Sequence, residues 1–190
     1  MVSGQVQNQR ISLHGVLVDV LDIGILISGK SGIGKSECAL DLVQRGHRLV
    51  ADDLIELRKT PSKGIVGSGS EIIRHSMEVR GVGVIDVEAL FGICAVLDSR
   101  RVDLVIEMEE WDPQMEYERL GMEQLSTEIM GVEIPLVRIP VSPGRNMATI
   151  VEVAARNQIL LRRGRNSALE LEKRILKETT SALPDDGGGE

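Results

Sequence analysis

The segment ISGKSGIGKSECAL, residues 27–40, decides the fold of this chain. Four of its residues have the spacing G-x-x-x-x-G-K-S: Gly29, Gly34, Lys35 and Ser36. An apolar run, residues 16–27, precedes the segment, and residues 35–45 follow with the spacing of a helix. A strand, a glycine-rich turn and a helix, in that order, form the context in which this spacing binds phosphate.

Each residue type in this loop has its own role in binding phosphate. Glycines let successive backbone N–H groups curve around phosphate oxygens, and the start of the following helix carries a partial positive charge. Lys35 adds a charge for the terminal phosphates, and the Ser36 hydroxyl can ligate Mg²⁺. We therefore predict that one continuous segment binds the phosphates: Gly29, Lys30, Ser31, Gly32, Ile33, Gly34, Lys35 and Ser36.

Two aspartates follow the predicted helix. The run HRLVADD, residues 47–53, reads as a short apolar strand that ends in Asp52 and Asp53, and Gly46 separates it from the helix. We expect this strand to lie directly beside the strand that enters the loop, in a βαβ unit, with its carboxylates at the same edge. Because neighbouring side chains of a strand point to opposite faces, only one of the two should face the phosphate, where it can act as a general base.

The overall composition excludes several classes of partner. Formal net charge is −7, the pI is near 5.1, and aromatic residues make up 2% of the chain. Neither a basic field nor a stacking surface for nucleic acid is therefore expected. Cys38 and Cys94 fall in apolar surroundings and are both predicted to be buried thiols. Without a signal peptide or a membrane span in the pattern, we expect a cytoplasmic protein with no membrane partner.

The rest of the chain predicts a mixed sheet followed by helices. Strand propensity is high in three further runs: LIELRK (54–59), MEVRGVGVIDV (77–87) and RVDLVIEM (101–108). Residues 132–141 contain two prolines, which favour extended chain at a sheet edge or on the surface. Asn146 is a suitable N-cap for a helix that ends before Gly164, apolar nearly all round and so expected to pack on two surfaces.

We expect one main domain with short extensions. Residues 1–10 are predicted to be a flexible N-terminal segment, residues 11–165 the catalytic domain, and residues 166–190 a tail that is helical and then disordered. The predicted fold class is α/β, with a mixed β-sheet that carries the phosphate-binding loop and is flanked by helices.

Four blocks of sequence in order resemble the catalytic domain of the bacterial HPr kinase/phosphorylase family, across roughly residues 12–160. They are HGVLVDV with the loop, LVQRGHRLVADD, MEVRGVGVIDV, and PVSPGRN with IVEVAA. The resemblance implies a nucleotide-binding core similar to that of phosphoenolpyruvate carboxykinase. It also implies a kinase that uses Mg²⁺ and ATP or pyrophosphate to phosphorylate a serine of the phosphocarrier HPr, that reverses this by phosphorolysis, and that forms a homohexamer.

The same resemblance implies roles for individual residues. Asp53 would take the serine proton and return it in reverse, His14 would tune that carboxylate, and Lys35 and Arg119 would act on the phosphates. Ser36 and Glu78 would ligate Mg²⁺. A supporting set completes the predicted site: Asp52, Arg80, Gly81, Gly83, Pro140, Gly144 and Arg145, of which residues 140–145 match a loop linked to dephosphorylation.

The sequence departs from the family pattern in two ways, and three alternative functions stay open. Most of the N-terminal domain of many family members has no counterpart here, and Lys30 stands where the family commonly has an acidic residue. Lys30 is therefore a candidate for shifting the preference between nucleotide and pyrophosphate. The alternatives are another P-loop ATPase, GTPase or small-molecule kinase; a regulatory protein that binds nucleotide without turnover; and a kinase of this family acting on a different protein.

Overall fold

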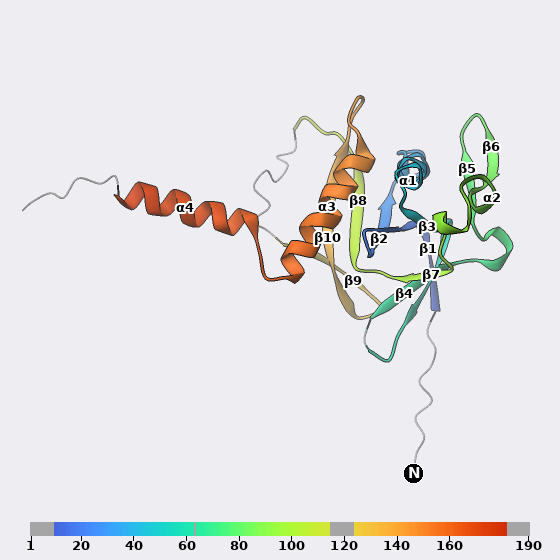
Figure 1. The fold of residues 1–190 in the computed structure, drawn as a ribbon, viewed down its shortest axis with the longest axis horizontal. Helices are drawn as coiled ribbons and strands as arrows, with labels where there is room; N and C mark the ends of the chain where they lie inside the picture. The colour runs from blue at the N-terminus through green and yellow to red at the C-terminus, as the bar shows by residue number, and fades with distance from the viewer. Residues whose placement is uncertain (1–9, 63, 115–123, 182–190) are drawn as a thin grey trace, which may run out of the picture.

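The computed structural model describes residues 10–62, 64–114 and 124–181. In chain order its elements are β1 (Arg10–Val20), β2 (Ile23–Gly29), α1 (Lys35–Gln44), β3 (Arg48–Lys59), β4 (Ile65–Gly69), η1 (Glu71–Ile73), β5 (Ser76–Val79), β6 (Gly83–Asp86), α2 (Val87–Phe91), η2 (Ile93–Ala95), β7 (Ser99–Arg101), β8 (Leu104–Glu110), β9 (Leu125–Ile129), β10 (Val132–Val141), α3 (Met147–Arg162) and α4 (Ser167–Ser181). Figure 1 shows α1 and α3 against the sheet and the β5–β6 hairpin at its side.

The main sheet is mixed, as predicted. Its eight strands have the order β7-β4-β3-β1-β2-β8-β10-β9. β2 pairs in parallel with β8, whereas β1 pairs antiparallel with both β2 and β3. The sequence suggested that β3, the strand after the loop helix, lies directly beside β2, the strand before the loop. This expectation is wrong, because β1 lies between them.

Alternating side chains of the strands fill two separate cores. On one face, residues such as Val18, Ile25 and Ile27 pack under α1 and α3. On the other face, Leu17 and Leu26 share a core with Val102 and with buried residues from β3, β4, β8, β9 and β10, and no residue of a described helix belongs to it. This second core needs no helix because the sheet curls, and burial of its Val, Ile and Leu side chains stabilises the curled form.

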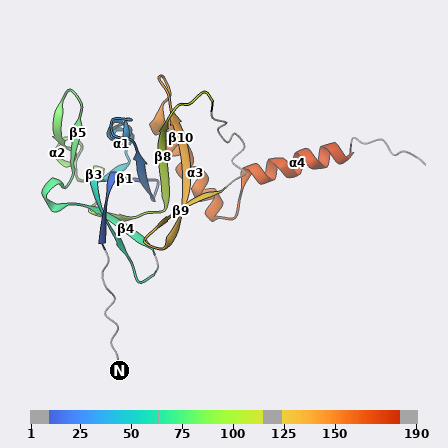
Figure 2. The ribbon, with the colours of Figure 1, turned by 180° about the vertical axis from the view of Figure 1, so that it is seen from behind.

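One hydrogen bond shows directly that the main sheet is curled. Lys59 Nζ, at the end of β3, donates to the carbonyl of Met130, in the turn between β9 and β10, at 3.0 Å. The two segments come from opposite halves of the sheet order, so the sheet must bend for them to meet. Figure 2 shows β4 and β9 approaching each other at the lower end of the molecule.

Two strand predictions need correction. The run 47–53 is not a short strand, because β3 continues through the predicted separate strand 54–59. β10 is also not an edge strand: β8 and β9 flank it. Its prolines are nevertheless tolerated, because β9 pairs with residues 132–136 and β8 with residues 136–141, so that each proline has a ladder on one side only.

The run 77–87 forms its own small sheet. β5 and β6 pair antiparallel, apart from the main sheet, and Gly81 and Gly83 at the turn have φ angles of 86° and 104°. No atom lies within 4 Å of a Cβ added at either glycine, so these glycines serve a left-handed turn conformation and not a close backbone approach.

The predicted helix at residues 146–163 is present as α3. The Asn146 side chain accepts a hydrogen bond from the Thr149 amide, and Gly164 follows with a φ of 77°. Ala148, Val151 and Ala155 are buried against the sheet and α1, but Val153 is 59% exposed, so in the single chain the helix packs on one side. α4 lies within residues 166–190, and it extends away from the sheet in Figures 1 and 2.

The two cysteines differ in environment. Cys38 is buried, and burial raises the pKa of its thiol to about 12. Cys94 is exposed, which contradicts the prediction that both are buried: in this segment the core takes up the next two residues, Ala95 and Val96, and the Cys94 side chain stays at the surface. Within the described ranges, no helix is both long and apolar enough to cross a membrane.

Candidate active site

The glycine-rich loop joins β2 to α1 at the carboxyl end of β2. Gly34 has a φ of 104° and occupies the N-cap position of α1, which begins at Lys35. Lys35 Nζ donates hydrogen bonds to the carbonyls of Gly29 and Lys30, each at 3.0 Å. These bonds hold the ammonium group over the loop, at the start of a helix whose free amides favour anions.

Ser36 and Asp52 are hydrogen-bonded to each other. Ser36 Oγ donates to Asp52 Oδ1 at 2.9 Å, which links the first turn of α1 to the middle of β3. Burial raises the pKa of the Asp52 carboxyl above its ordinary value, and hydrogen bonds from Ser36 and from the backbone of Glu78 oppose this shift. A hydroxyl and a carboxylate oxygen thus lie side by side, as ligands for a hard cation do.

Asp53 and His14 form the second contact of the site. His14 Nδ1 lies 3.4 Å from Asp53 Oδ1, and both side chains are more than three-quarters exposed. Asp53 pairs with Gly15 of β1 and has a φ of 70°. This left-handed conformation breaks the alternation of the strand, so both Asp52 and Asp53 face the same cavity, and the expectation that only one would do so is wrong.

The β5–β6 hairpin forms the opposite wall. Glu78 and Arg80 line the cavity, and Arg80 Nη2 would lie 3.3 Å from a Cβ added at Gly32 of the loop. The cavity measures about 230 Å³. Its lining consists of Gly15, Val16, Ser31, Gly32, Gly34, Lys35, Ser36, Glu37, Asp52, Asp53, Glu78 and Arg80.

Several predicted site residues lie outside this lining. Lys30 Nζ is 3.3 Å from Glu110 Oε1 at the end of β8, and Ile33 packs against the core. Arg145 donates to the carbonyl of Pro140 at 2.8 Å, within its own turn. Other predicted residues absent from the lining are His14, Gly29, Gly81, Gly83, Pro140 and Gly144. Arg119 lies outside the described residues.

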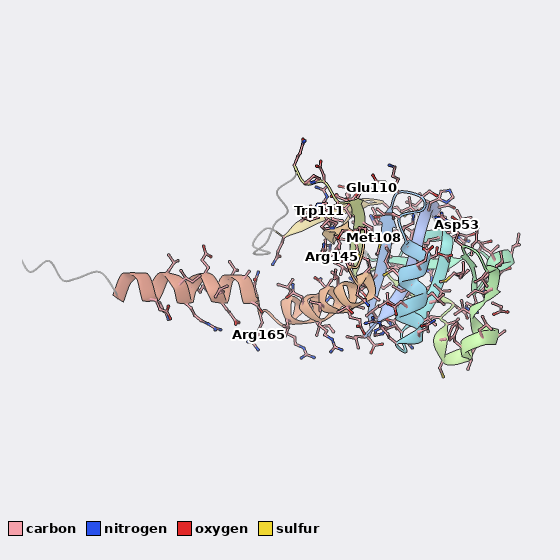
Figure 3. The ribbon with its side chains drawn as sticks, turned by 90° about the horizontal axis from the view of Figure 1, so that it is seen from above. Asp53, Met108, Glu110, Trp111, Arg145 and Arg165 are labelled. Carbon is pink, nitrogen blue, oxygen red and sulfur yellow. The ribbon has the colours of Figure 1, made fainter. Side chains whose placement is uncertain are left out.

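A view from above shows where the predicted loop at residues 140–145 lies relative to Asp53. Figure 3 labels Asp53 on one side and Met108, Glu110, Trp111 and Arg145 on the other, at the ends of β8 and β10. The predicted loop at residues 140–145 is thus at the same edge as the cavity but does not line it.

Sequence reasoning missed three lining residues. Gly15 and Val16 reach the cavity because β1 lies between β2 and β3, a strand order that no local pattern encodes. A glycine within a strand, directly after His14, was a usable signal of close approach: a Cβ at Gly15 would lie 2.8 Å from the carbonyl oxygen of Ile27. Glu37 enters through the first turn of α1.

The donor set fits Mg²⁺ bound together with phosphates. Ser36 and Asp52 supply adjacent oxygen ligands, and Glu78 lines the same cavity. Among the described residues there is no cluster of three or more His, Cys, Asp or Glu side chains arranged to hold a metal by themselves. Mg²⁺ commonly takes one or two carboxylates and obtains its other ligands from phosphate and water, so this sparse set is the expected one.

The fold and the cavity define a class: an α/β domain in which a glycine-rich loop, a lysine and three aspartate or glutamate side chains from β3 and β5 face one cleft, an arrangement suited to phosphoryl groups. The family model described as "HPr Serine kinase C-terminal domain" matches residues 5–175. The chain belongs to this family.

Relatives and a solved structure agree with this assignment. The chain is 53% identical over 164 residues to an HPr kinase/phosphorylase of Geobacter sulfurreducens and, over the same length, to one of Geobacillus thermodenitrificans, covering 86% of this chain in each case. It spans about half the length of these relatives, 51% and 53% respectively. The structure titled as the Hpr(Ser) kinase/phosphatase from Coxiella burnetii matches 80% of this chain and 99% of its own, with a TM-score of 0.74 and 31% identity. This match confirms the mixed α/β fold.

Proposed function

We propose that this chain is a Mg²⁺-dependent protein-serine kinase and phosphorylase. It transfers a phosphoryl group from ATP or pyrophosphate to a serine of HPr, and it reverses the transfer by phosphorolysis to pyrophosphate. The relatives named HPr kinase/phosphorylase support this activity, although the chain spans only about half of their length. The observation that carries the proposal is the convergence of Lys35, Ser36 and Asp53 on one cleft.

Asp53 is proposed as the group that moves the proton. In the forward direction its carboxylate accepts the proton of the serine hydroxyl while the serine oxygen bonds to phosphorus and the bond from phosphorus to the donor's bridging oxygen breaks. In the reverse direction an oxygen of inorganic phosphate bonds to phosphorus while the bond from phosphorus to the serine oxygen breaks, and the protonated carboxyl gives its proton to that leaving oxygen. His14, 3.4 Å away, is proposed as a positioning residue that hydrogen-bonds Asp53 and holds its carboxylate toward the cleft.

The cationic residues are proposed to hold the phosphates. Lys35 already lies over the loop through its bonds to two carbonyls, and phosphate oxygens would replace these partners. Arg80 faces the cavity from the hairpin and adds a second positive charge. When bound, Mg²⁺ would neutralise charge on the phosphoryl oxygens, and Ser36, Asp52 and Glu78 are the residues proposed to hold it. Arg119 is predicted to be a third cationic residue that acts on the phosphates.

Several finer expectations belong to the same proposal. They are a likeness of the loop and sheet to the nucleotide-binding core of phosphoenolpyruvate carboxykinase, a homohexameric assembly, HPr as the protein partner, and a role of residues 140–145 in the reverse reaction. The absence of nucleic acid and membrane partners and a cytoplasmic location stay predictions from composition.

The test is incubation of the chain with HPr, Mg²⁺ and either ATP or pyrophosphate, with phosphoserine read by mass spectrometry. The Asp53→Asn variant should lose at least about a hundredfold in rate, the usual contribution of a positioned acid–base group. Asp22→Asn is the matched control, since Asp22 also has a positive φ, of 64°, which asparagine tolerates, and it does not line the cleft.

Two results would change the assignment in different ways. If the parent protein gave no phosphoserine and no phosphorolysis of phosphorylated HPr, yet bound nucleotide, a regulatory nucleotide-binding role or another protein substrate would replace the proposal. If Asp53→Asn kept the full rate, the general-base role alone would fall.

A further inference from the structure

The β5–β6 hairpin has one core face and one outer face. Met77, Val79 and Ile85 point to the core, where Met77 is 1% exposed. Side chains alternate along each strand, so Glu78 and Val84, which pair directly across the hairpin, share the outer face. The outer face therefore includes the proposed Mg²⁺ ligand and, beside it, a valine.

Apolar side chains are exposed on this outer face and at its tip. Val84 is 75% exposed, and Val82, between the two turn glycines, is 74% exposed. Neither packs against the described part of the core. Because these side chains are mostly in solvent, the chain itself gains little from their burial, and an exposed apolar patch beside a cleft can mark a contact with another molecule.

The position of the two valines limits what that molecule can be. Glu78 and Arg80 of the same hairpin line the cleft, and Arg80 reaches the loop at Gly32. The cleft lining is otherwise polar or glycine, except for Val16, which is 1% exposed. Among the described residues of the cleft lining and the hairpin, Val82 and Val84 are therefore the exposed apolar side chains that an acceptor bringing a hydroxyl to Asp53 can contact.

We propose that Val82 and Val84 form a docking contact for the acceptor protein, binding apolar side chains that flank its reactive serine. This inference rests on the proposed function, because it requires the acceptor to be a folded protein whose serine reaches Asp53. Phosphate donors are small and bind at the loop, so the contact serves acceptor recognition and not donor binding. Apolar contacts surrounded by polar ones are a common source of binding energy at protein interfaces.

The test compares acceptor and donor kinetics in the double variant Val82→Ser/Val84→Ser. The KM for HPr should rise about tenfold or more, whereas the KM for pyrophosphate and for ATP should change by less than about twofold. Ile72→Ser is the matched control: Ile72 is 94% exposed in η1, before the hairpin, and its loss should leave both constants unchanged. Val84→Thr, which keeps a β-branched side chain in the strand, provides a second variant should the double variant fold poorly.

Each outcome decides a separate point. An unchanged KM for HPr in a folded double variant overturns the docking contact while leaving the kinase assignment intact. A change in the KM for either donor overturns it as well, since the face would then act on the donor. A change in subunit number by light scattering would identify the face as a contact between copies. If the parent protein phosphorylates no HPr, the proposed function is overturned, and with it the proposal that HPr docks on Val82 and Val84.

Discussion

Asp52 is a carboxylate that the fold buries beside Ser36. Burial raises its pKa above the ordinary value of 3.8, so the folded state binds the proton more tightly than the unfolded chain does. The charged form therefore lowers the free energy of unfolding progressively as the pH rises from below 3.8 through the raised pKa. At neutral pH the metal-free protein carries this cost, which a bound cation would offset.

Substitution of Asp52 should separate stability from metal binding. In the presence of EDTA, Asp52→Asn should raise the free energy of unfolding by about 1 kcal/mol at neutral pH, because the buried charge is removed while an oxygen remains to accept from Ser36. With Mg²⁺ and pyrophosphate, the variant should gain less stabilisation than the parent. Thermal unfolding in both buffers measures this, and a lower midpoint of the variant in EDTA would contradict it.

Lys30 departs from the residue type that is common in the family, and the structure places it outside the cleft. Its ammonium group lies near Glu110, outside the cleft lining, and both side chains are about three-quarters exposed. We expect Lys30→Ala to change the KM for ATP and for pyrophosphate by less than about twofold, since exposed ion pairs contribute little. Steady-state kinetics with both donors measures this, and a selective change for one donor would restore Lys30 as a specificity residue.

Sequence alone correctly predicted the site residues whose position follows from a local sequence motif. The loop residues Lys35 and Ser36 and the neighbouring Asp52 and Asp53 are all in the cleft, because their spacing encodes a strand, a turn and a helix. The expectation that only one of these two carboxylates faces the cleft failed, because the strand pattern does not report the positive φ at Asp53. Gly15 and Glu37 were not predicted, because their presence in the cleft depends on how the strands and α1 pack in the folded chain.

Among the elements, α1 and α3 are joined by a polar cluster at one end. His47 Nε2 lies 2.8 Å from Glu152 Oε1, and Arg45 Nη1 lies 3.0 Å from Glu152 Oε2. The hydrogen bond from His47, followed by that from Arg45, lowers the pKa of Glu152 below its ordinary value of 4.5. A lowered pKa means that the contribution to stability is present above about 4.5 and is lost as the pH falls through the folded-state value.

Glu152→Gln should therefore destabilise the protein in a pH-dependent way. Because the Glu152 side chain is 21% exposed, we expect a loss of about 0.5–1 kcal/mol at neutral pH, and a smaller difference from the parent as the pH falls below about 4.5. Urea unfolding at a series of pH values measures this. Glu172→Gln on exposed α4 is the control, and a constant difference at every pH would show that the effect is not electrostatic.

Element predictions failed where pairing partners decided the outcome. The sequence of β3 contains two strand-like runs with aspartates between them, and only continuous pairing with β1 makes them one strand. The hairpin run 77–87 has the same propensity as a sheet strand, but its two turn glycines fold it back on itself. Helices α1 and α3 were predictable, because glycines and the Asn146 cap mark their ends locally.

For the whole molecule, the predicted mixed α/β class was correct and the strand order was not predictable. A loop between β2 and α1 indicates a parallel crossover, yet nothing local reveals that an earlier strand occupies the place between its two strands. Curling of the sheet is likewise a collective result, because two cores must be filled from the two faces of the same strands. The cleft is thus assembled from β1, β3, β5 and the loop, which are distant in sequence.

Because these elements meet only in the folded chain, a ligand in the cleft should stabilise the whole domain. Pyrophosphate with Mg²⁺, at a concentration about a hundredfold above its Kd, should add about 2.7 kcal/mol and raise the unfolding midpoint by about 5–10 °C. Lys35→Ala should remove most of this shift, since the ammonium group lies over the loop. Lys30→Ala, in the same loop but outside the cleft, should retain it. A full shift in Lys35→Ala would mean that pyrophosphate binds elsewhere on the protein, and calorimetric titration of the two variants would then locate the loss of affinity.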